Sequence, residues 1–370
     1  MLVFAAFGAV VGAFSGSIPT LVRQTGVSSQ TFGLALTGLT IATILVMAFG
    51  SALSRRFSNR SLLLAALPLL ALSLAAMLLA KSEAQLIAAS IAHGLVLGLT
   101  DLIMNAEGSA LESDLQRPVF TSFHGSVSIS IAFFAIFSSF LSARYGIGAA
   151  AAVAALVCAL AWTAVFKKVP ARQRQTKSQR LSAGMVSAPL ILMGLIAGLA
   201  IACETSAMYW SAKLLDEAAP ELAAVTGLGV AFFGLCNAII RFPGDALRAR
   251  FGDFPLMTAS SVLAITGFVS LSLSSSFSFS VFSFALVGLG TAIICPCIYN
   301  MAAAQTPSNR AAGLSFALLV TGAPRIAVPA IFGALSGAFS TKAAFGLCAA
   351  LMLAALVLVI MLRSGARVQP

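Results

Sequence analysis

The sequence predicts an all-α membrane protein of twelve transmembrane helices, arranged as two pseudo-symmetric six-helix bundles. Hydrophobic residues make up 59% of the 370 residues and charged residues only 9%, whereas a soluble domain uses about 25% charged residues. The few charges are clustered and leave apolar runs of roughly 20 residues, enough to cross a hydrocarbon core of about 30 Å. In addition, a short sequence recurs at the same place in each half of the chain.

Charges and clusters of Gly, Pro and Ser divide the chain into twelve predicted spans. The first six are expected near 2–22, 31–53, 61–81, 84–108, 118–142 and 146–166, and the second six near 187–212, 222–243, 254–275, 278–304, 311–338 and 341–362. Residues 1–22 lack a charged leader and a small-residue cleavage site, so we expect a first span rather than a signal peptide.

Basic residues predict the orientation. Of the 22 Lys and Arg residues, sixteen fall in loops that are cytoplasmic if the N-terminus is inside, Arg241 among them. Five fall on the opposite side, and the remaining one, Arg325, lies within a span. This bias follows the positive-inside rule and predicts a multi-pass protein of a bacterial inner membrane with both termini in the cytoplasm.

Two features divide the chain into halves. Residues 167–186 are polar and basic, which is typical of a cytoplasmic linker between a half at 1–166 and a half at 187–370. Residues 50–59 (GSALSRRFSN) align without gaps with residues 244–253 (GDALRARFGD), each copy following the second span of its half. Parallel six-helix repeats with a binding site between them are a known plan of secondary transporters.

The composition also argues against other classes of protein. The net charge of +11 resides in short loops rather than in a solvated basic domain, so we expect no nucleic-acid partner. The two histidines stand on different spans without a H-E-x-x-H or G-x-S-x-G context, so we expect neither an enzyme nor a cofactor. The expected partners are the lipid bilayer, a small-molecule substrate and protons, with the chain acting as a monomer.

The second copy of the repeat resembles the signature motif of the major facilitator superfamily, G-D-x-x-x-x-R-x-G. The residues that match are Arg241, Gly244, Asp245, Arg248, Arg250, Phe251 and Gly252. The first copy is degraded, with Ser51 in place of the acid. The resemblance covers essentially the whole chain. It implies alternating access and a conformational latch formed by Gly244, Asp245, Arg248 and Arg250, in which Asp245 faces the N-terminus of a neighbouring helix, span eleven. A simple topology-setting loop is the alternative.

A narrower resemblance points to a subgroup of that superfamily. The pattern D-x-x-x-N-A-E-x-x-x-x-E at 101–112 precedes a span that opens with Ser122, Phe123 and His124. This pattern, together with residues 204–210, resembles an uncharacterised bacterial subgroup that is distantly similar to proton-coupled fucose-permease-like transporters. The resemblance implies a class of protein and does not name a substrate.

Ionisable residues within spans are candidate functional groups because they are costly in lipid. Asp101 and Asn105 share one face of span four at helical spacing, and Asp101 is either a proton or substrate group or a structural carboxylate. Arg325 in span eleven cannot shed its charge and needs a partner. That partner is either Glu204 of span seven or an anionic group of the substrate.

Uncharged polar groups complete the candidate site. His124 is either a proton relay or a hydrogen-bonded structural residue. Tyr299 and Asn300 in span ten suit either a small polar solute or helix packing. Tyr209 and Trp210 are expected in the outer interfacial belt.

Cys295, Pro296 and Cys297 form a C-P-C sequence in span ten that is open to two interpretations. The favoured one is a proline-kinked helix that lines the cavity; the other is a soft-metal site for copper transport. A third class, a non-transporting membrane receptor on the same fold, is the remaining alternative. We therefore expect a secondary active transporter of a small organic solute, coupled to protons.

Overall fold

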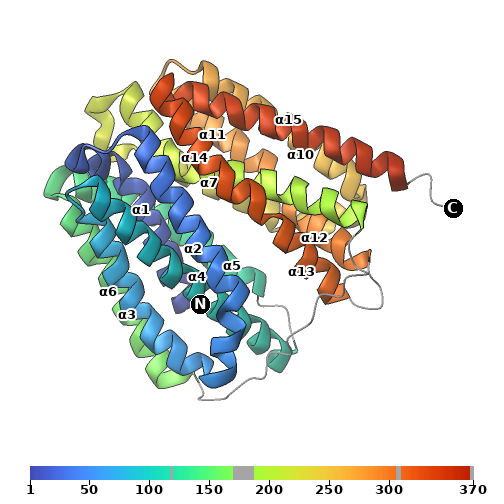
Figure 1. Ribbon diagram of the computed structural model, residues 1–370, viewed down its shortest axis with the longest axis horizontal. Helices are drawn as coiled ribbons and strands as arrows, with labels where there is room; N and C mark the ends of the chain where they lie inside the picture. The colour runs from blue at the N-terminus through green and yellow to red at the C-terminus, as the bar shows by residue number, and fades with distance from the viewer. Residues whose placement is uncertain (117–119, 170–186, 306–309, 367–370) are drawn as a thin grey trace. The chain divides into compact units, whose positions relative to one another are not determined.

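The computed structural model describes residues 1–116, 120–169, 187–305 and 310–366, which are almost entirely helical and contain no β-strand (Figure 1). The expected linker therefore lies outside the described residues, apart from its first three residues. Two compact units emerge from the packing. Unit 1 comprises Met1–Ser178 with Tyr209–Ala231, and unit 2 comprises Gln179–Met208 with Phe232–Pro370.

Unit 1 contains the first six helices of the chain. They are α1 (Leu2–Thr25), α2 (Ser29–Arg56), α3 (Asn59–Leu78), α4 (Glu83–Leu115), α5 (Phe120–Tyr145) and α6 (Ile147–Lys168). Serine residues set three of the starts, since Ser28, Ser58 and Ser82 each accept a hydrogen bond from a first-turn amide of the helix that follows. The end of α7 (Ala188–Ala218), the 3-10 helix η2 (Pro220–Val225) and the start of α8 (Leu228–Arg241) also belong to unit 1.

Unit 2 contains the remaining parts of α7 and α8 and the helices that follow. These are α9 (Gly244–Phe251), α10 (Asp253–Leu273), α11 (Phe277–Thr291), α12 (Ile294–Ala304), α13 (Arg310–Val320), α14 (Gly322–Ala338) and α15 (Thr341–Ala366).

The predicted fold class is confirmed. Eleven helical segments of the described chain are long and apolar enough to span a membrane, and a twelfth is obtained if α8 and α9, bent by 53°, form one broken span. The repeat motif differs from expectation, because residues 244–251 form the helix α9 rather than a loop. Span eight thus starts later than predicted, after the 3-10 turn at Pro220, and includes α9 only if α8 and α9 form one broken span.

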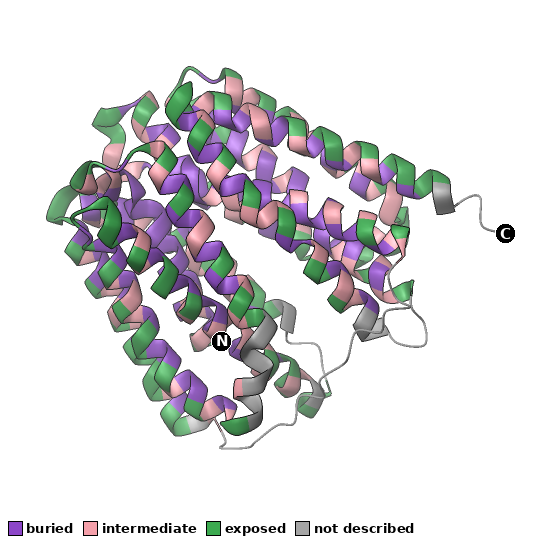
Figure 2. Cartoon of the chain, viewed as in Figure 1, coloured by how far each residue is buried: buried purple, intermediate pink, exposed green. Residues whose placement is uncertain are grey.

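A stripe of glycines brings α1 and α5 into backbone contact in unit 1. Gly8, Gly12 and Gly16 recur every four residues along one face of α1. A Cβ atom on Gly12 would lie 2.5 Å from the carbonyl oxygen of Ile131 on α5. Only a residue without a side chain permits such an approach between membrane helices. Among the described spans, α1 has the largest buried share, whereas the last helix, α15, shows many exposed residues (Figure 2).

Two aromatic residues contradict the sequence-based expectation of an interfacial belt. Tyr209 is 7% exposed and Trp210 is fully buried. Tyr209 packs edge-on against Phe14 of α1, and Trp210 against Phe32 of α2. The two residues were expected at the membrane interface because they lie near the end of a predicted span. The end of α7 is instead packed within unit 1. Large exposed apolar side chains, suited to lipid, instead cover α6 and α15, for example Leu156 and Ile360.

Candidate polar site in unit 2

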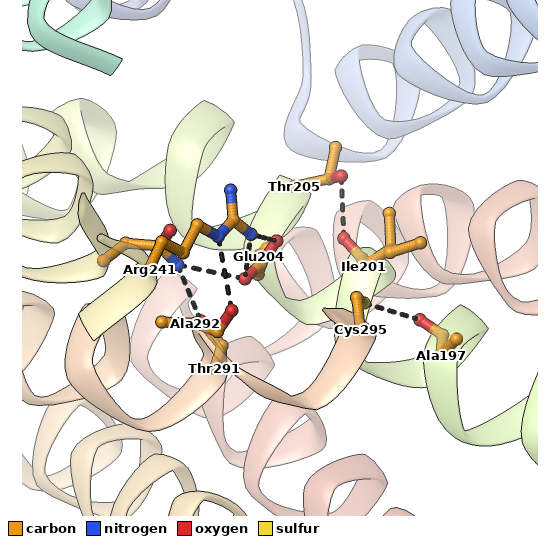
Figure 3. A network of polar contacts seen from close by, with 9 residues as sticks. Ala197, Ile201, Glu204, Thr205, Arg241, Thr291, Ala292 and Cys295 are labelled. Carbon is orange, nitrogen blue, oxygen red and sulfur yellow. Dashed lines mark hydrogen bonds and ion pairs between the residues drawn. The ribbon is translucent and has the colours of Figure 1, made fainter. Parts of the chain in front are cut away.

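The site begins with a break in span ten, between α11 and α12. Pro296 is the third residue of α12 and has no amide hydrogen to offer the carbonyl of Ala292, four residues earlier. That carbonyl accepts a hydrogen bond from Nε of Arg241 at 3.3 Å (Figure 3). The guanidinium of α8 therefore occupies the place of the donor that proline removes. The predicted interruption of the helix at Pro296 is present, and its lining of a cavity stays a prediction.

The same arginine holds the carboxylate of Glu204, which lies near the middle of α7. The guanidinium of Arg241 contacts both carboxylate oxygens, at 3.2 and 3.3 Å, and Asn237, one turn earlier on α8, donates to the same carboxylate at 3.1 Å. Asn237 also lies 3.5 Å from the hydroxyl of Thr291 at the end of α11. Glu204 is 15% exposed and Arg241 42% exposed. Two side chains of α8 thus bind the carboxylate of α7 and also contact the junction of α11 and α12.

Two expectations from the sequence are corrected by this pair. Arg241 was expected in a cytoplasmic loop, but it is the last residue of the helix α8 and lies beside the middle of α7. Glu204 was one of the two candidate partners of Arg325, and that ion pair does not form. Asn237 and Thr291 were not anticipated, although the i, i+4 spacing of Asn237 and Arg241 on an amphipathic helix was visible in the sequence.

The position of α14 explains why Arg325 does not reach Glu204. Gly198 of α7 packs against Thr321 and Pro324, where a Cβ atom on Gly198 would lie 3.0 Å from each residue. Glu204 lies six residues further along α7, about 9 Å at 1.5 Å per residue. Arg325 is instead close enough to Tyr299 and Cys295 for its charge to act on both side chains. It forms no ion pair within the described part of the chain.

The predicted polar stripe on α4 of unit 1 is present. The amide of Asn105 donates to the Asp101 carboxylate at 2.8 Å, so the two side chains share one face of the helix. The amide oxygen of Asn105 is buried and has no hydrogen-bond partner among the described residues. Asp101 makes a further interaction beyond this bond. Glu107, off that stripe, accepts from Asn59 at 3.0 Å.

The remaining candidates are dispersed. His124 at the start of α5 is exposed, and its ring lies edge-on to Phe4. Asn300 is exposed, whereas its neighbour Tyr299 lies within reach of the charges of Glu204, Arg241 and Arg325. The structure therefore brings Tyr299 into the polar cluster and leaves Asn300 at its edge.

The two thiols of the C-P-C sequence face different neighbours. The sulfur of Cys295 lies 3.9 Å from the carbonyl of Ala197 on α7. Cys297, two residues or about 200° further round the helix, lies beside Asp253 and Arg248. No group of three metal-ligating side chains occurs among the described residues. The geometry therefore gives the copper interpretation no support.

The motif helix α9 shows a local ion-pair network. Gly244 is buried, and a Cβ atom there would lie 2.9 Å from the side chain of Ile293 at the break in span ten. Arg248 bonds to Asp253 at 2.8 Å and to Asp245 at 3.1 Å. The Asp245 side chain is 97% exposed. Residues 306–309, just before α13, lie outside the described residues, so the expected contact of Asp245 with the start of span eleven is not tested.

Arg250, the fourth predicted latch residue, is exposed and stacks over the ring of Phe251, with its guanidinium carbon 5.2 Å from the ring centroid. It takes no part in the network around Arg248 within the described residues.

Comparison with known proteins agrees with this architecture. The family model of the Major Facilitator Superfamily matches residues 1–217 and again residues 206–370. The chain belongs to the Major Facilitator Superfamily. Members of this superfamily are transporters that bind small-molecule substrates and work as single chains.

Curated bacterial relatives extend over almost the whole chain. An uncharacterised transporter of this superfamily from Yersinia pestis is 25% identical over 95% of the chain and 91% of its own length. An uncharacterised transporter from Sinorhizobium fredii is 26% identical over 93% of both chains. The membrane protein MosC of Rhizobium meliloti is 23% identical over 90% of the chain and 81% of its own length.

Solved structures share the fold. A mutant of the nucleoside transporter NupG superposes with a TM-score of 0.82 at 12% identity, covering 98% of both chains. A bacterial homologue of the human lysosomal transporter Spinster gives 0.71 at 11% identity over 98% of this chain and 96% of the other. The human organic anion transporter MFSD10 gives 0.64 at 16% identity over 97% and 98%. At these identities the likeness establishes the superfamily fold alone.

Proposed function

We propose that this Major Facilitator Superfamily protein moves a small organic solute across a bacterial inner membrane by alternating access and is driven by protons. The two bodies that rock would be the halves at 1–166 and 187–370, joined by the linker at 167–186, with both termini in the cytoplasm and the monomer as the working form. The positive-inside charge bias and the internal repeat support this arrangement.

The observation that carries the proposal is the Glu204–Arg241 pair within unit 2. A carboxylate held by a guanidinium at membrane depth is costly to maintain and therefore points to function. A proton on Glu204 removes its negative charge and with it the attraction that holds Arg241. Arg241 also donates a hydrogen bond to Ala292 at the break in span ten. Protonation of Glu204 on α7 would therefore affect the contacts of α8 and of span ten as well.

Asp101 is the second proposed proton or substrate group, and Asn105 holds its carboxylate on the face of α4. A proton carried on Asp101 would change that hydrogen bond and leave the Asn105 amide to bind solute. His124, exposed at the start of α5 beside Phe4, is the proposed relay for protons.

Glu204→Gln keeps the shape of the side chain and removes its charge. In proteoliposomes with an imposed pH gradient, wild-type protein is expected to accumulate solute above equilibrium. Glu204→Gln is expected to exchange solute across the membrane without accumulating it. Accumulation that ignores the gradient in wild type would contradict proton coupling. Accumulation that survives undiminished in Glu204→Gln would contradict the role of Glu204, and the same result in Asp101→Asn would contradict the role of Asp101.

A further inference from the structure

Unit 2 contains three acidic residues, and each already has a cationic partner. Glu204 is paired with Arg241, and both Asp245 and Asp253 are paired with Arg248. No Asp or Glu occurs in the sequence from Phe254 to Pro370. The acids that this unit can offer to another cation are therefore all engaged in the structure.

Arg325 lies well inside a membrane-spanning helix and has no ion-pair partner among the described residues. It lies in the first turns of α14, within the span Gly313–Ala338, and is half-buried. Its guanidinium forms no ion pair and no side-chain hydrogen bond with any residue that the structure describes. Arginine stays charged at every physiological pH, so the charge cannot be removed by loss of a proton. A lone charge at this depth costs several kcal/mol unless an anion or water compensates it, with about 3 kcal/mol as the lower figure.

The charges around Tyr299 and Cys295 add up to one net positive charge. Glu204, Arg241 and Arg325 are the three charged side chains of this cluster that act on both residues. Glu204 and Arg241 cancel each other, and Arg325 remains. Asp253 and Arg248 form a separate neutralised pair beside Cys297.

We propose that the transported solute is an organic monoanion whose carboxylate supplies the missing counter-charge at Arg325. This inference rests on the proposed transport function and deepens it by naming the substrate class. A guanidinium binds a carboxylate through two parallel hydrogen bonds, and the hydroxyl of Tyr299, which the charge of Arg325 reaches, provides a further donor. One negative charge neutralises the cluster, whereas a phosphate dianion would leave it negative.

Pro324 holds the backbone of this arginine in position. Pro324 directly precedes Arg325 and is the third residue of α14, just as Pro296 is the third residue of α12. Gly198 packs on Pro324 from α7. The backbone that carries Arg325 is thereby fixed against α7, while its long side chain remains available to a ligand. A fixed backbone lowers the cost of orienting the guanidinium when a ligand binds.

The test uses the full chain in lipid nanodiscs and measures thermal unfolding. Acetate, lactate, benzoate and nicotinate are each compared with their primary amides, at constant ionic strength set with sodium chloride. We expect the carboxylates to raise the melting temperature more than their amides in wild type. The matched control Arg144→Gln, at the exposed end of α5, should retain this difference, and Arg325→Gln should lose it.

A second measurement separates binding from structural support. Ligand-free Arg325→Gln should melt at or above the wild-type temperature, because it removes an uncompensated charge. Arg325→Lys keeps the positive charge but lacks the planar guanidinium. It should retain a smaller difference between the melting-temperature shifts caused by the acids and by their amides. A melting temperature of ligand-free Arg325→Gln well below wild type would contradict the inference. So would equal shifts for acids and amides, or a difference that survives in Arg325→Gln.

The two proposals fail in different ways. If wild-type proteoliposomes transport a neutral solute and Arg325→Gln transports it equally well, the anion inference is wrong and the transport function stands. If wild-type proteoliposomes move neither the acids nor the amides nor any solute that shifts the melting temperature, the proposed function itself is wrong.

Discussion

Nε of Arg241 donates to the carbonyl oxygen of Ala292 across 3.3 Å, and that carbonyl lacks a helical partner because Pro296 has no amide hydrogen. The bond ties the end of α8 to the break in span ten. It also holds the guanidinium where it meets Glu204. A missing backbone donor in one helix is thus coupled to an ion pair between two others.

Replacing Pro296 by alanine should restore the amide that Ala292 lacks and extend α12 towards α11. Proline is about 3 kcal/mol less favourable than alanine within a helix, so we expect unchanged or higher thermal stability. Transport should fall, because Arg241 loses its acceptor in span ten.

Pro68→Ala is the matched control for that experiment. Pro68 of α3 likewise frees the carbonyl of Leu64, which accepts from the indole nitrogen of Trp162 at 3.0 Å, but no charged group is involved. Transport should therefore persist in Pro68→Ala. Equal loss of uptake in both variants would contradict this prediction, because it would show that transport depends on helix-breaking prolines in general and not on the Arg241 hydrogen bond.

Removing one partner of the central ion pair should destabilise the protein. Arg241→Gln leaves Glu204 with Asn237 as its hydrogen-bond donor among the described residues. Loss of one partner from a fully buried pair costs about 3–5 kcal/mol, and the cost here should be smaller because Arg241 is 42% exposed. Thermal unfolding of Arg241→Gln, Glu204→Gln and the double variant measures the coupling. A strictly additive double variant would mean that the two side chains do not interact.

Helix packing in unit 1 depends on the glycine stripe of α1. Gly12→Ala places a methyl group against the carbonyl of Ile131 and should push α1 from α5. Overpacking of this kind costs about 1–3 kcal/mol. Gly148→Ala in α6 is the control, since its nearest neighbour is a side-chain atom of Leu79 at 3.9 Å. Comparable melting temperatures for the two variants would refute the close approach.

The motif network should depend more on Asp253 than on Asp245. Both carboxylates bind Arg248, but Asp253 is 21% exposed and Asp245 is 97% exposed. Exposed ion pairs contribute about 0–1 kcal/mol, so Asp245→Asn should leave the melting temperature nearly unchanged, while Asp253→Asn lowers it. Transport assays then test the latch: a loss of uptake in Asp245→Asn without a loss of stability indicates a role in another conformation.

The two cysteines of span ten are not expected to form a copper site. Cys295 and Cys297 face different helices, so a Cu(I) ion cannot be held by both without unwinding α12. We expect Cu(I) to shift the melting temperature of wild type and of Cys295→Ser equally. A shift that only the wild type shows would restore the metal interpretation.

Much of the fold follows from the sequence because it depends on local properties. The apolar runs predicted the membrane spans, and the i, i+4 spacing predicted that Asp101 and Asn105 share a face. The partner of Glu204 could not be obtained this way. Arg241 is 37 residues distant and reaches Glu204 through the packing of α8 against α7, which sequence spacing does not reveal.

The burial of Trp210 was missed for a related reason. A tryptophan near a helix end suits either lipid headgroups or protein, and the choice depends on which helices pack around it. Here Phe32 of α2 does. Sequence periodicity gives the face of a helix but not the neighbour that covers it. For the same reason the sequence did not predict that Arg325 is separated from Glu204. That separation depends on where α14 packs against α7, at Gly198.

Solute accumulation in proteoliposomes tests the central claim most directly. The solute that most raises the melting temperature is offered outside vesicles with and without an inward proton gradient, using wild type and Glu204→Gln. The account predicts accumulation above equilibrium only for wild type with the gradient, and exchange without accumulation for Glu204→Gln. Equal accumulation with and without the gradient, or undiminished accumulation by Glu204→Gln, would contradict it.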